Sequence, residues 1–191
     1  INGKDGKIKA MGLDLKRSDT PVFIQQFLMS VLEQVLQGVE KDQIIEYITN
    51  FRKEFRTYPG WEMGTPKRVN NLTKYKDLLA QNGKVDMPGH VRASLNWNTL
   101  REINNDRESL RITDGFKVIV CKLSNNLFDY TSIAYPIDEL KLPDWFKSLN
   151  FDKNEMEKTL IDNKIENLLG VLQWELQQHN NKNTFDDLFE F

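Results

Sequence analysis

Apolar residues recur at helical spacing over long stretches of the chain, and this periodicity limits the fold more than any other feature of the sequence. The first stretch follows Ser18, Asp19 and Thr20, which are typical helix-capping residues, and Pro21, which suits a first turn. Gly38 is expected to end this helix. Its apolar positions are Val22, Phe23, Phe27, Val31, Leu32 and Val35.

Three further helices are predicted from the same periodicity. The second spans about residues 41–56, and the short link containing Gly38 predicts an antiparallel pair with the first helix. The third spans residues 91–103, and the last spans residues 152–177 with an interruption near Gly170. The second helix has one apolar side, formed by Ile44, Ile45, Ile48, Phe51 and Phe55.

Short β-like runs form the rest of the expected fold. Residues 116–123 and 131–135 are separated by a polar turn and predict a hairpin. Residues 61–84 are expected to be a polar, basic connection with a short helix at about 69–79 and too few apolar residues for a core. The predicted fold class is therefore mainly α with a small β element (α+β).

Composition narrows the class of protein. The one cysteine, Cys121, lies in an apolar run and is expected to be a buried structural thiol. No apolar run approaches the roughly 20 residues of a membrane helix, and no signal sequence opens the chain, so a soluble, intracellular protein is expected. The first residue is Ile1 rather than Met, which suggests a processed product or a piece of a longer protein.

Signals of catalysis are weak. His90 and His179 lie far apart and outside any Cys/His cluster, and no phosphate-binding glycine loop or serine-nucleophile motif occurs. Asp186 and Asp187 are adjacent, but on a chain end they are expected to be solvated charges rather than metal ligands. The chain alone is expected to catalyse nothing.

Charge is distributed unevenly although the formal net charge is only -2. Residues 67–101 contain seven basic and two acidic residues, whereas residues 137–191 contain six basic and twelve acidic ones. Within residues 67–76, cations, amides, a hydroxyl and an aromatic ring alternate, and these side chains contact nucleic-acid phosphates and sugars without selecting a sequence. A solvated polar loop is the alternative interpretation of this segment.

The C-terminal residues 184–191 combine three Phe and one Leu with three carboxylates, after a polar spacer at 177–183. Aromatic side chains at such a chain end are expected to need another protein surface to be buried. This composition predicts a docking peptide.

Several segments together resemble the C-terminal thumb region of family B DNA polymerases of the T-even phage type. Residues 9–14 (Lys-Ala-Met-Gly-Leu-Asp) and 16–21 (Lys-Arg-Ser-Asp-Thr-Pro) resemble the palm-to-thumb junction. Residues 70–75 (Asn-Asn-Leu-Thr-Lys-Tyr) and 90–92 (His-Val-Arg) resemble two thumb motifs. Residues 185–191 (Phe-Asp-Asp-Leu-Phe-Glu-Phe) resemble the tail that holds the sliding clamp. Four motifs in the family's order make the resemblance specific.

The resemblance implies a thumb-like helical domain with a short hairpin and a flexible C-terminal tail. Residues 1–20 would be the palm–thumb junction, 21–176 the thumb, and 177–191 the tether and clamp-binding peptide. It implies duplex contacts by Lys9, Asn70, Asn71, Lys74, Tyr75, His90 and Arg92. Charge adds Lys67, Arg68 and Lys84 to these, although residues 83–89 depart from the family pattern. The clamp-binding anchors would be Phe185, Leu188, Phe189 and Phe191.

The resemblance also implies what lies outside this chain. Polymerase chemistry uses paired palm aspartates that bind two metal ions, and Mg²⁺ is the expected ion, but the palm motif is absent here. No cofactor is therefore expected in this chain. Its partners would be primer–template DNA, a sliding clamp, and the exonuclease, palm and fingers of the polymerase, in the cytoplasm of an infected bacterium, with no membrane.

Two alternatives stay open at this point. The chain is either a fragment of a phage replicative polymerase or the smaller subunit of a split one, and Ile1 favours the fragment. A non-enzymatic phage adaptor that binds a ring through its tail is the alternative from another class. A nuclease or transferase in its own right lacks a suitable set of carboxylates or histidines.

Overall fold

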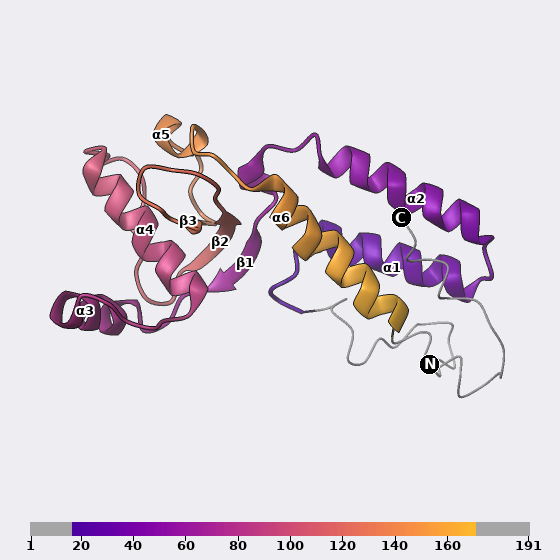
Figure 1. The fold of residues 1–191 in the computed structure, drawn as a ribbon, viewed down its shortest axis with the longest axis horizontal. Helices are drawn as coiled ribbons and strands as arrows, with labels where there is room; N and C mark the ends of the chain where they lie inside the picture. Colours follow the sequence, from indigo (N-terminus) through magenta and orange to yellow (C-terminus); the bar gives the residue numbers. More distant parts are fainter. Residues whose placement is uncertain (1–16, 171–191) are drawn as a thin grey trace. The chain divides into compact units, whose positions relative to one another are not determined.

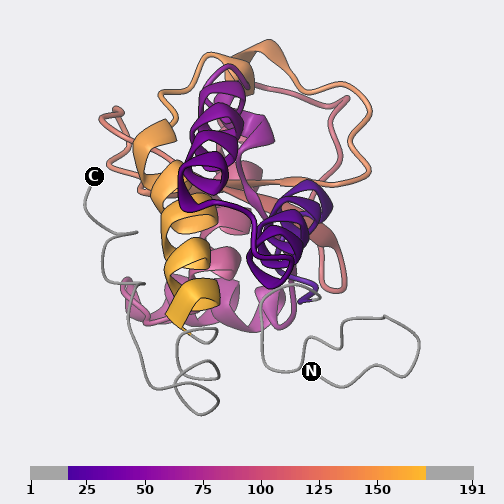
Figure 2. The ribbon, with the colours of Figure 1, turned by 90° about the vertical axis from the view of Figure 1, so that its right-hand side faces the viewer.

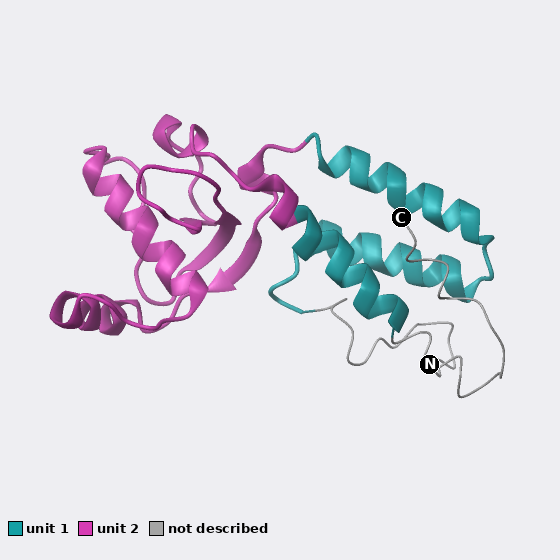
Figure 3. Cartoon of the chain, in the orientation of Figure 1, with its two compact units in different colours: residues 1–57, 157–191 teal, residues 58–156 magenta. Residues whose placement is uncertain are grey.

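The computed structural model describes residues 17–170, which form two compact units (Figure 3). Of the described residues, 17–57 and 157–170 belong to the first unit, and 58–156 form the second. The fold class is mainly α with one three-stranded antiparallel sheet, which confirms the sequence prediction. None of the helices in the described part of the chain has both the length and the apolar character needed to cross a bilayer.

The first unit begins with the predicted helix pair, α1 (Val22–Leu36) and α2 (Lys41–Phe55). A Schellman motif ends α1: the amide of Gly38 donates to Val35 O at 3.1 Å, and that of Val39 donates to Gln34 O at 3.0 Å. Gly38 has φ +72°, a conformation that favours glycine, so its predicted role is confirmed.

The predicted cap at the start of α1 is wrong. The N-cap position is Pro21, which has no side chain that can cap the helix, and the buried Thr20 hydroxyl has no hydrogen-bond partner among the described residues. Instead, the Gln25 amide reaches back from the first turn and donates to Arg17 O and Thr20 O. Backbone carbonyls of residues 17–20 therefore hold this segment to the helix. The side-chain types of residues 18–20 did not predict this contact.

Aromatic stacking joins α1 to α2. Phe27 of α1 stacks on Phe51 of α2 with ring centroids 3.8 Å apart, and it also stacks on Tyr47 at 5.7 Å. The spacing of these residues puts them on facing stripes of the two helices. The core of α1 is Ile24, Phe27, Leu28, Val31 and Leu32, and α2 adds Ile44, Ile48 and Phe55.

A third helix of the first unit contains a π-helical turn. The chain passes from α6 (Lys153–Glu157) through the π segment η3 (Lys158–Asp162) into helical residues 163–170, shown in gold in Figures 1 and 2. In the π segment the amide of Asn163 donates to Lys158 O, five residues back. The predicted helix is confirmed up to Gly170, but its predicted end at 177 lies outside the described residues.

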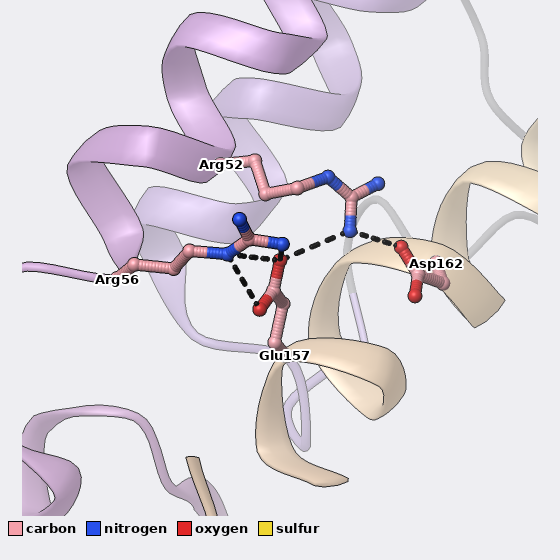
Figure 4. A network of polar contacts seen from close by, with 4 residues as sticks. All are labelled: Arg52, Arg56, Glu157 and Asp162. Atoms are coloured by element: carbon pink, nitrogen blue, oxygen red, sulfur yellow. Dashed lines mark hydrogen bonds and ion pairs between the residues drawn. The ribbon is translucent and has the colours of Figure 1, made fainter. Parts of the chain in front are cut away.

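Two arginines at the C-terminal end of α2, Arg52 and Arg56, bond to acidic residues at the π segment (Figure 4). A turn that bonds residues five apart brings Glu157 and Asp162 to the same side of the helix, where both accept from Arg52 Nη1, at 3.1 Å and 2.5 Å. Arg56 Nε donates to both carboxylate oxygens of Glu157 at 3.0 Å. These contacts join the third helix of this unit to α2.

The second unit is built on a sheet of strand order β1-β2-β3. Its strands are β1 (Thr65–Arg68), β2 (Lys117–Lys122) and β3 (Ser132–Pro136). The β2–β3 hairpin confirms the prediction from the two apolar runs. The sequence missed β1, which contains Pro66 and two cations and pairs with a strand about fifty residues later.

The expectation that residues 61–84 lack core residues is also wrong. Met63 and Val69 are 1% and 0% exposed, and Leu72 is buried as well. These apolar residues lie at single positions between polar ones, so they form no run that composition detects. The short helix expected at about 69–79 is confirmed as α3 (Leu72–Asn82), preceded by a single 3₁₀ turn at η2 (Gly60–Glu62).

The predicted third helix is α4 (Gly89–Ile103), which packs on β2 and β3. It sends polar side chains into the core. Both amide atoms of Asn98 bond the backbone of Ile112 at 2.9 Å, and Asn96 Nδ2 donates to Ser132 O at 2.9 Å. Trp97 Nε1 donates to Leu110 O at 2.9 Å. These bonds satisfy buried backbone groups that a purely apolar helix face would leave unpaired.

An aromatic cluster surrounds the short helix α5 (Asp144–Lys147). Phe146 is fully buried, and its ring centroid lies 5.3 to 5.4 Å from those of Trp97, Tyr135 and Phe151 in edge-on arrangements. Cys121 of β2 is fully buried, as predicted, and burial raises the pKa of its thiol. The thiol is therefore protonated at neutral pH and not a nucleophile.

Candidate nucleic-acid interface

Helix α3 is the centre of the candidate interface, and its two ends are fixed by residues in the left-handed region. Asn71 at the N-terminal end has φ +61°, and Gly83 at the C-terminal end has φ +68°. Asn tolerates this conformation better than other side-chain-bearing residues. The sharp turns at both ends allow a short polar helix to stand between β1 and α4.

An acidic residue occupies the start of α3. The amide of Leu72 donates to Asp114 Oδ1 at 2.5 Å, and the Thr73 hydroxyl donates to Asp114 Oδ2 at 3.3 Å. A carboxylate at a helix N-terminus satisfies free amides and favours the positive end of the helix dipole. The N-terminus of α3 is therefore occupied by this chain's own carboxylate and not open to an external phosphate.

Nine predicted duplex-contacting residues belong to the second unit and lie on or next to β1, α3 and the start of α4. Lys67 and Arg68 lie on β1, Asn70 and Asn71 lead into α3, and Lys74 and Tyr75 lie in its first turns. The remaining members follow α3 or begin α4: Lys84, His90 and Arg92. Six are exposed, whereas Lys67, Tyr75 and His90 are half-buried.

The other predicted site residues cannot be placed. Lys9 lies outside the described residues, as do the tail residues Phe185, Leu188, Phe189 and Phe191. The palm–thumb junction is described only from residue 17 onwards, and the tether and clamp-binding peptide at 177–191 lie entirely outside the described range. Their predicted roles stay predictions.

Several of the exposed cations are held in place by neighbours. Arg92 Nη2 donates to Val85 O at 2.7 Å, and Arg68 Nη1 donates to Gly115 O at 3.2 Å. Lys74 Nζ lies 5.8 Å from the centroid of the Tyr75 ring, within range of a cation–π contact. None of these neighbours carries a negative charge. These contacts restrict the cationic side chains, which lowers the entropic cost of binding an anion.

His90 differs from the cations around it. Burial and, second, the positive charge of Lys67 lower the pKa of His90 below its ordinary 6.5. His90 is therefore neutral at pH 7 and offers a hydrogen bond rather than a charge.

Sequence reasoning missed two residues of this region, Lys117 and Asp114. Lys117 lies directly opposite Arg68 in the β1–β2 register, and Asp114 caps α3. Both reach the region through the pairing of β1 with β2, so no local pattern marks them.

Within residues 17–170, no group of three or more His, Cys, Asp or Glu side chains is arranged to hold a metal ion. The nine predicted contact residues on or next to β1, α3 and the start of α4 are called the α3 region below. They provide exposed cations, amides and one aromatic ring. Such a set binds phosphates and sugars.

The comparisons with known proteins find similarity to DNA-directed DNA polymerases of two bacteriophages. No family model matches the chain. The chain is 32% identical over 130 residues to the DNA-directed DNA polymerase of Enterobacteria phage T4, and 30% identical over 131 residues to that of Escherichia phage RB69. Each match covers 68% of this chain but only 14% of the polymerase. The chain is thus related to one region of these phage polymerases, as its motifs indicated.

Proposed function

We propose that this chain is the thumb portion of a phage replicative DNA polymerase and grips the primer–template duplex through the α3 region. The observation that carries the proposal is the gathering of nine predicted duplex-contacting residues on β1, α3 and the start of α4. The relationship to part of two phage DNA polymerases supports it.

The grip would be independent of DNA sequence. Exposed lysines and arginines attract phosphates and release condensed counterions, whereas Asn70, Asn71 and Tyr75 are suited to hydrogen bonds with phosphate and sugar oxygens. No base-reading element is needed for this task. Nucleotide addition itself would be performed by the palm, whose aspartates would hold the expected Mg²⁺ ions. This chain would supply holding rather than bond formation.

The tail would add a second partner. Phe185, Leu188, Phe189 and Phe191 would enter an apolar pocket of a sliding clamp, and the neighbouring carboxylates would stay at its rim. A ring around DNA that is tethered to the polymerase raises the local concentration of enzyme at the primer end, which gives processivity. The exonuclease, palm and fingers would complete the polymerase, in the cytoplasm of an infected bacterium.

Salt dependence of duplex binding tests the grip. The 191-residue chain should bind a fluorescent 20-base-pair duplex of any sequence, and a plot of log Kd against log salt gives the number of phosphates neutralised. Lys74→Ala should change the slope by about 1 and weaken binding to unrelated duplexes equally. The matched control is Lys53→Ala, an exposed lysine in the last turn of α2 in the other unit.

The outcomes separate the grip from the alternatives. If the chain binds no duplex even at low salt, the proposed grip is wrong and the adaptor alternative gains. If Lys53→Ala changes the slope as much as Lys74→Ala does, net charge and not the α3 region is responsible. The tail is tested separately, by fluorescence anisotropy of a peptide of residues 184–191 with the cognate clamp; binding that survives loss of the Phe189 and Phe191 rings would refute the proposed anchors.

A further inference from the structure

Two cations face each other across the β1–β2 pair. The antiparallel register places Arg68 directly opposite Lys117. The next pair along makes the hydrogen bond from Val69 N to Phe116 O, so Arg68 and Lys117 occupy a non-hydrogen-bonded position. Side chains at such positions lie closest together, with Cβ atoms about 4.5 to 5.5 Å apart. Both residues are exposed.

This arrangement is unfavourable in the free protein. Like charges directly opposite each other destabilise a sheet. Within residues 17–170, neither side chain makes an ion pair with a carboxylate, and Arg68 donates to the uncharged carbonyl of Gly115. An anion placed between the two side chains would convert the repulsion into attraction.

The loop before β2 orients the Arg68 side chain. Gly115 has φ +89°, a conformation that suits glycine, and its amide donates to Val69 O at 2.7 Å. Its carbonyl accepts from Arg68 Nη1. A guanidinium carries five N–H donors, so one bond fixes its plane while the others remain available for phosphate oxygens.

We propose that Arg68 and Lys117 together bind one backbone phosphate of the duplex, which makes Lys117 a contact residue of the grip. The inference rests on the proposed function, because it takes the anion to be a phosphate of the same DNA. The site adjoins the α3 region through the residues between β1 and α3. Because Asp114 occupies the N-terminus of α3, the negative charge of DNA is directed to the cation pair and to Lys74 rather than to the helix end.

The test compares two lysines at opposite ends of one strand. Lys117 begins β2 and Lys122 ends it; both are exposed, and they are about 17 Å apart along the strand. In the 191-residue chain, Lys117→Gln should lower the magnitude of the salt slope of duplex binding by about 1, whereas Lys122→Gln should leave it unchanged. Arg68→Gln should lower it by a similar amount.

A second measurement uses the free chain. Because Lys117→Gln removes the cross-strand repulsion, it should raise the midpoint of thermal unfolding in the absence of DNA while weakening DNA binding. A variant that misfolds would instead show a lower unfolding midpoint together with weaker DNA binding. The same measurement on Lys122→Gln, which faces Ser132, should show no rise.

The possible results distinguish this site from the grip as a whole. If Lys74→Ala changes the slope but Lys117→Gln does not, the grip stands and the cation-pair site is wrong. If Lys117→Gln and Lys122→Gln change it equally, diffuse charge explains the binding and a defined phosphate site is again refuted. If the unaltered chain shows no duplex binding, the proposed function fails together with this inference.

Discussion

Replacing Glu157 by Gln should loosen the first unit and leave the second unit unchanged. Glu157 is 6% exposed and receives hydrogen bonds from Arg52 of α2 and from Arg56, the C-cap residue of that helix. Gln keeps the shape of the side chain but loses its charge and one of its two acceptor oxygens. The variant therefore removes the electrostatic part of the link between α2 and the helix that contains the π segment.

The magnitude follows from the exposure of each partner. A hydrogen bond to a charged group contributes about 1.5 to 3 kcal/mol, and the side chain of Arg52, 20% exposed, is buried enough for that range to apply. The side chain of Arg56 is 60% exposed, so its share is screened to the level of a surface ion pair. Arg52 also keeps Asp162 as a partner, which prevents the larger loss of a stranded buried charge. The expected loss is about 2 kcal/mol.

Hydrogen exchange measures this loss separately in each unit. About 2 kcal/mol corresponds to a fall of roughly 30-fold in the protection of amides in α2 and in residues 163–169. Amides of β2 and β3 serve as the internal reference. The control variant is Asp162→Asn, which pairs with Arg52 among the described residues and is more exposed than Glu157, so its loss should be smaller. Unchanged protection in α2, or an equal fall in β2 and β3, would refute the reasoning.

The pH dependence of this link has a definite sign. Burial alone would raise the pKa of Glu157, but the hydrogen bonds from Arg56 and Arg52 outweigh it and hold the pKa below its ordinary 4.5. A carboxylate with a lowered pKa in the folded state stabilises above its unfolded value and loses that contribution as pH falls through the folded value. The difference between the unaltered chain and Glu157→Gln should therefore be full at neutral pH and shrink below about pH 4.

Two further predictions concern the second unit. Asn98→Ala should lower the free energy of unfolding by about 2 to 5 kcal/mol, because it leaves the amide and the carbonyl of the fully buried Ile112 without partners. Asn96→Ala leaves one carbonyl without its partner and should cost about half as much. Denaturant unfolding followed by tryptophan fluorescence measures both losses. Burial opposes ionisation of Asp106, but hydrogen bonds from Ser109, Trp145 and the Glu108 amide lower its pKa to about 2. The ionised carboxylate therefore stabilises the fold fully above the ordinary pKa of 3.8, and this contribution is lost as pH falls towards 2. Asp106→Asn should remove this acid-sensitive component from the unfolding midpoint, and a midpoint that still falls by the same amount would contradict the assignment.

Local patterns predicted the helices because each carries its own signal. In α1 and α2 the apolar residues lie on one stripe, and Gly38 marks the end of α1 by a conformation that glycine favours. The β2–β3 hairpin was predictable for the same reason, since both strands are apolar runs. These elements depend little on distant parts of the chain.

The elements that were missed depend on distant partners. β1 is four residues long, contains Pro66, and becomes a strand because Thr65 pairs with Val120. The π segment brings Glu157 and Asp162 to Arg52, more than 100 positions earlier. For the candidate interface, the family motifs predicted the residues around α3, but Lys117 joins them only through the β1–β2 register. A sequence pattern without a register does not contain that information.

The division of the chain into units has a consequence for the order in which they form on the ribosome. The second unit is continuous, whereas the first needs segments from both sides of it. Arg56 is synthesised 101 residues before its partner Glu157. At a synthesis rate of about 5 to 20 residues per second, about 5 to 20 seconds pass between synthesis of α2 and synthesis of the helix that packs on it. The sheet and α4 are synthesised before that helix is made, so the second unit has all of its strands while the first still lacks a helix.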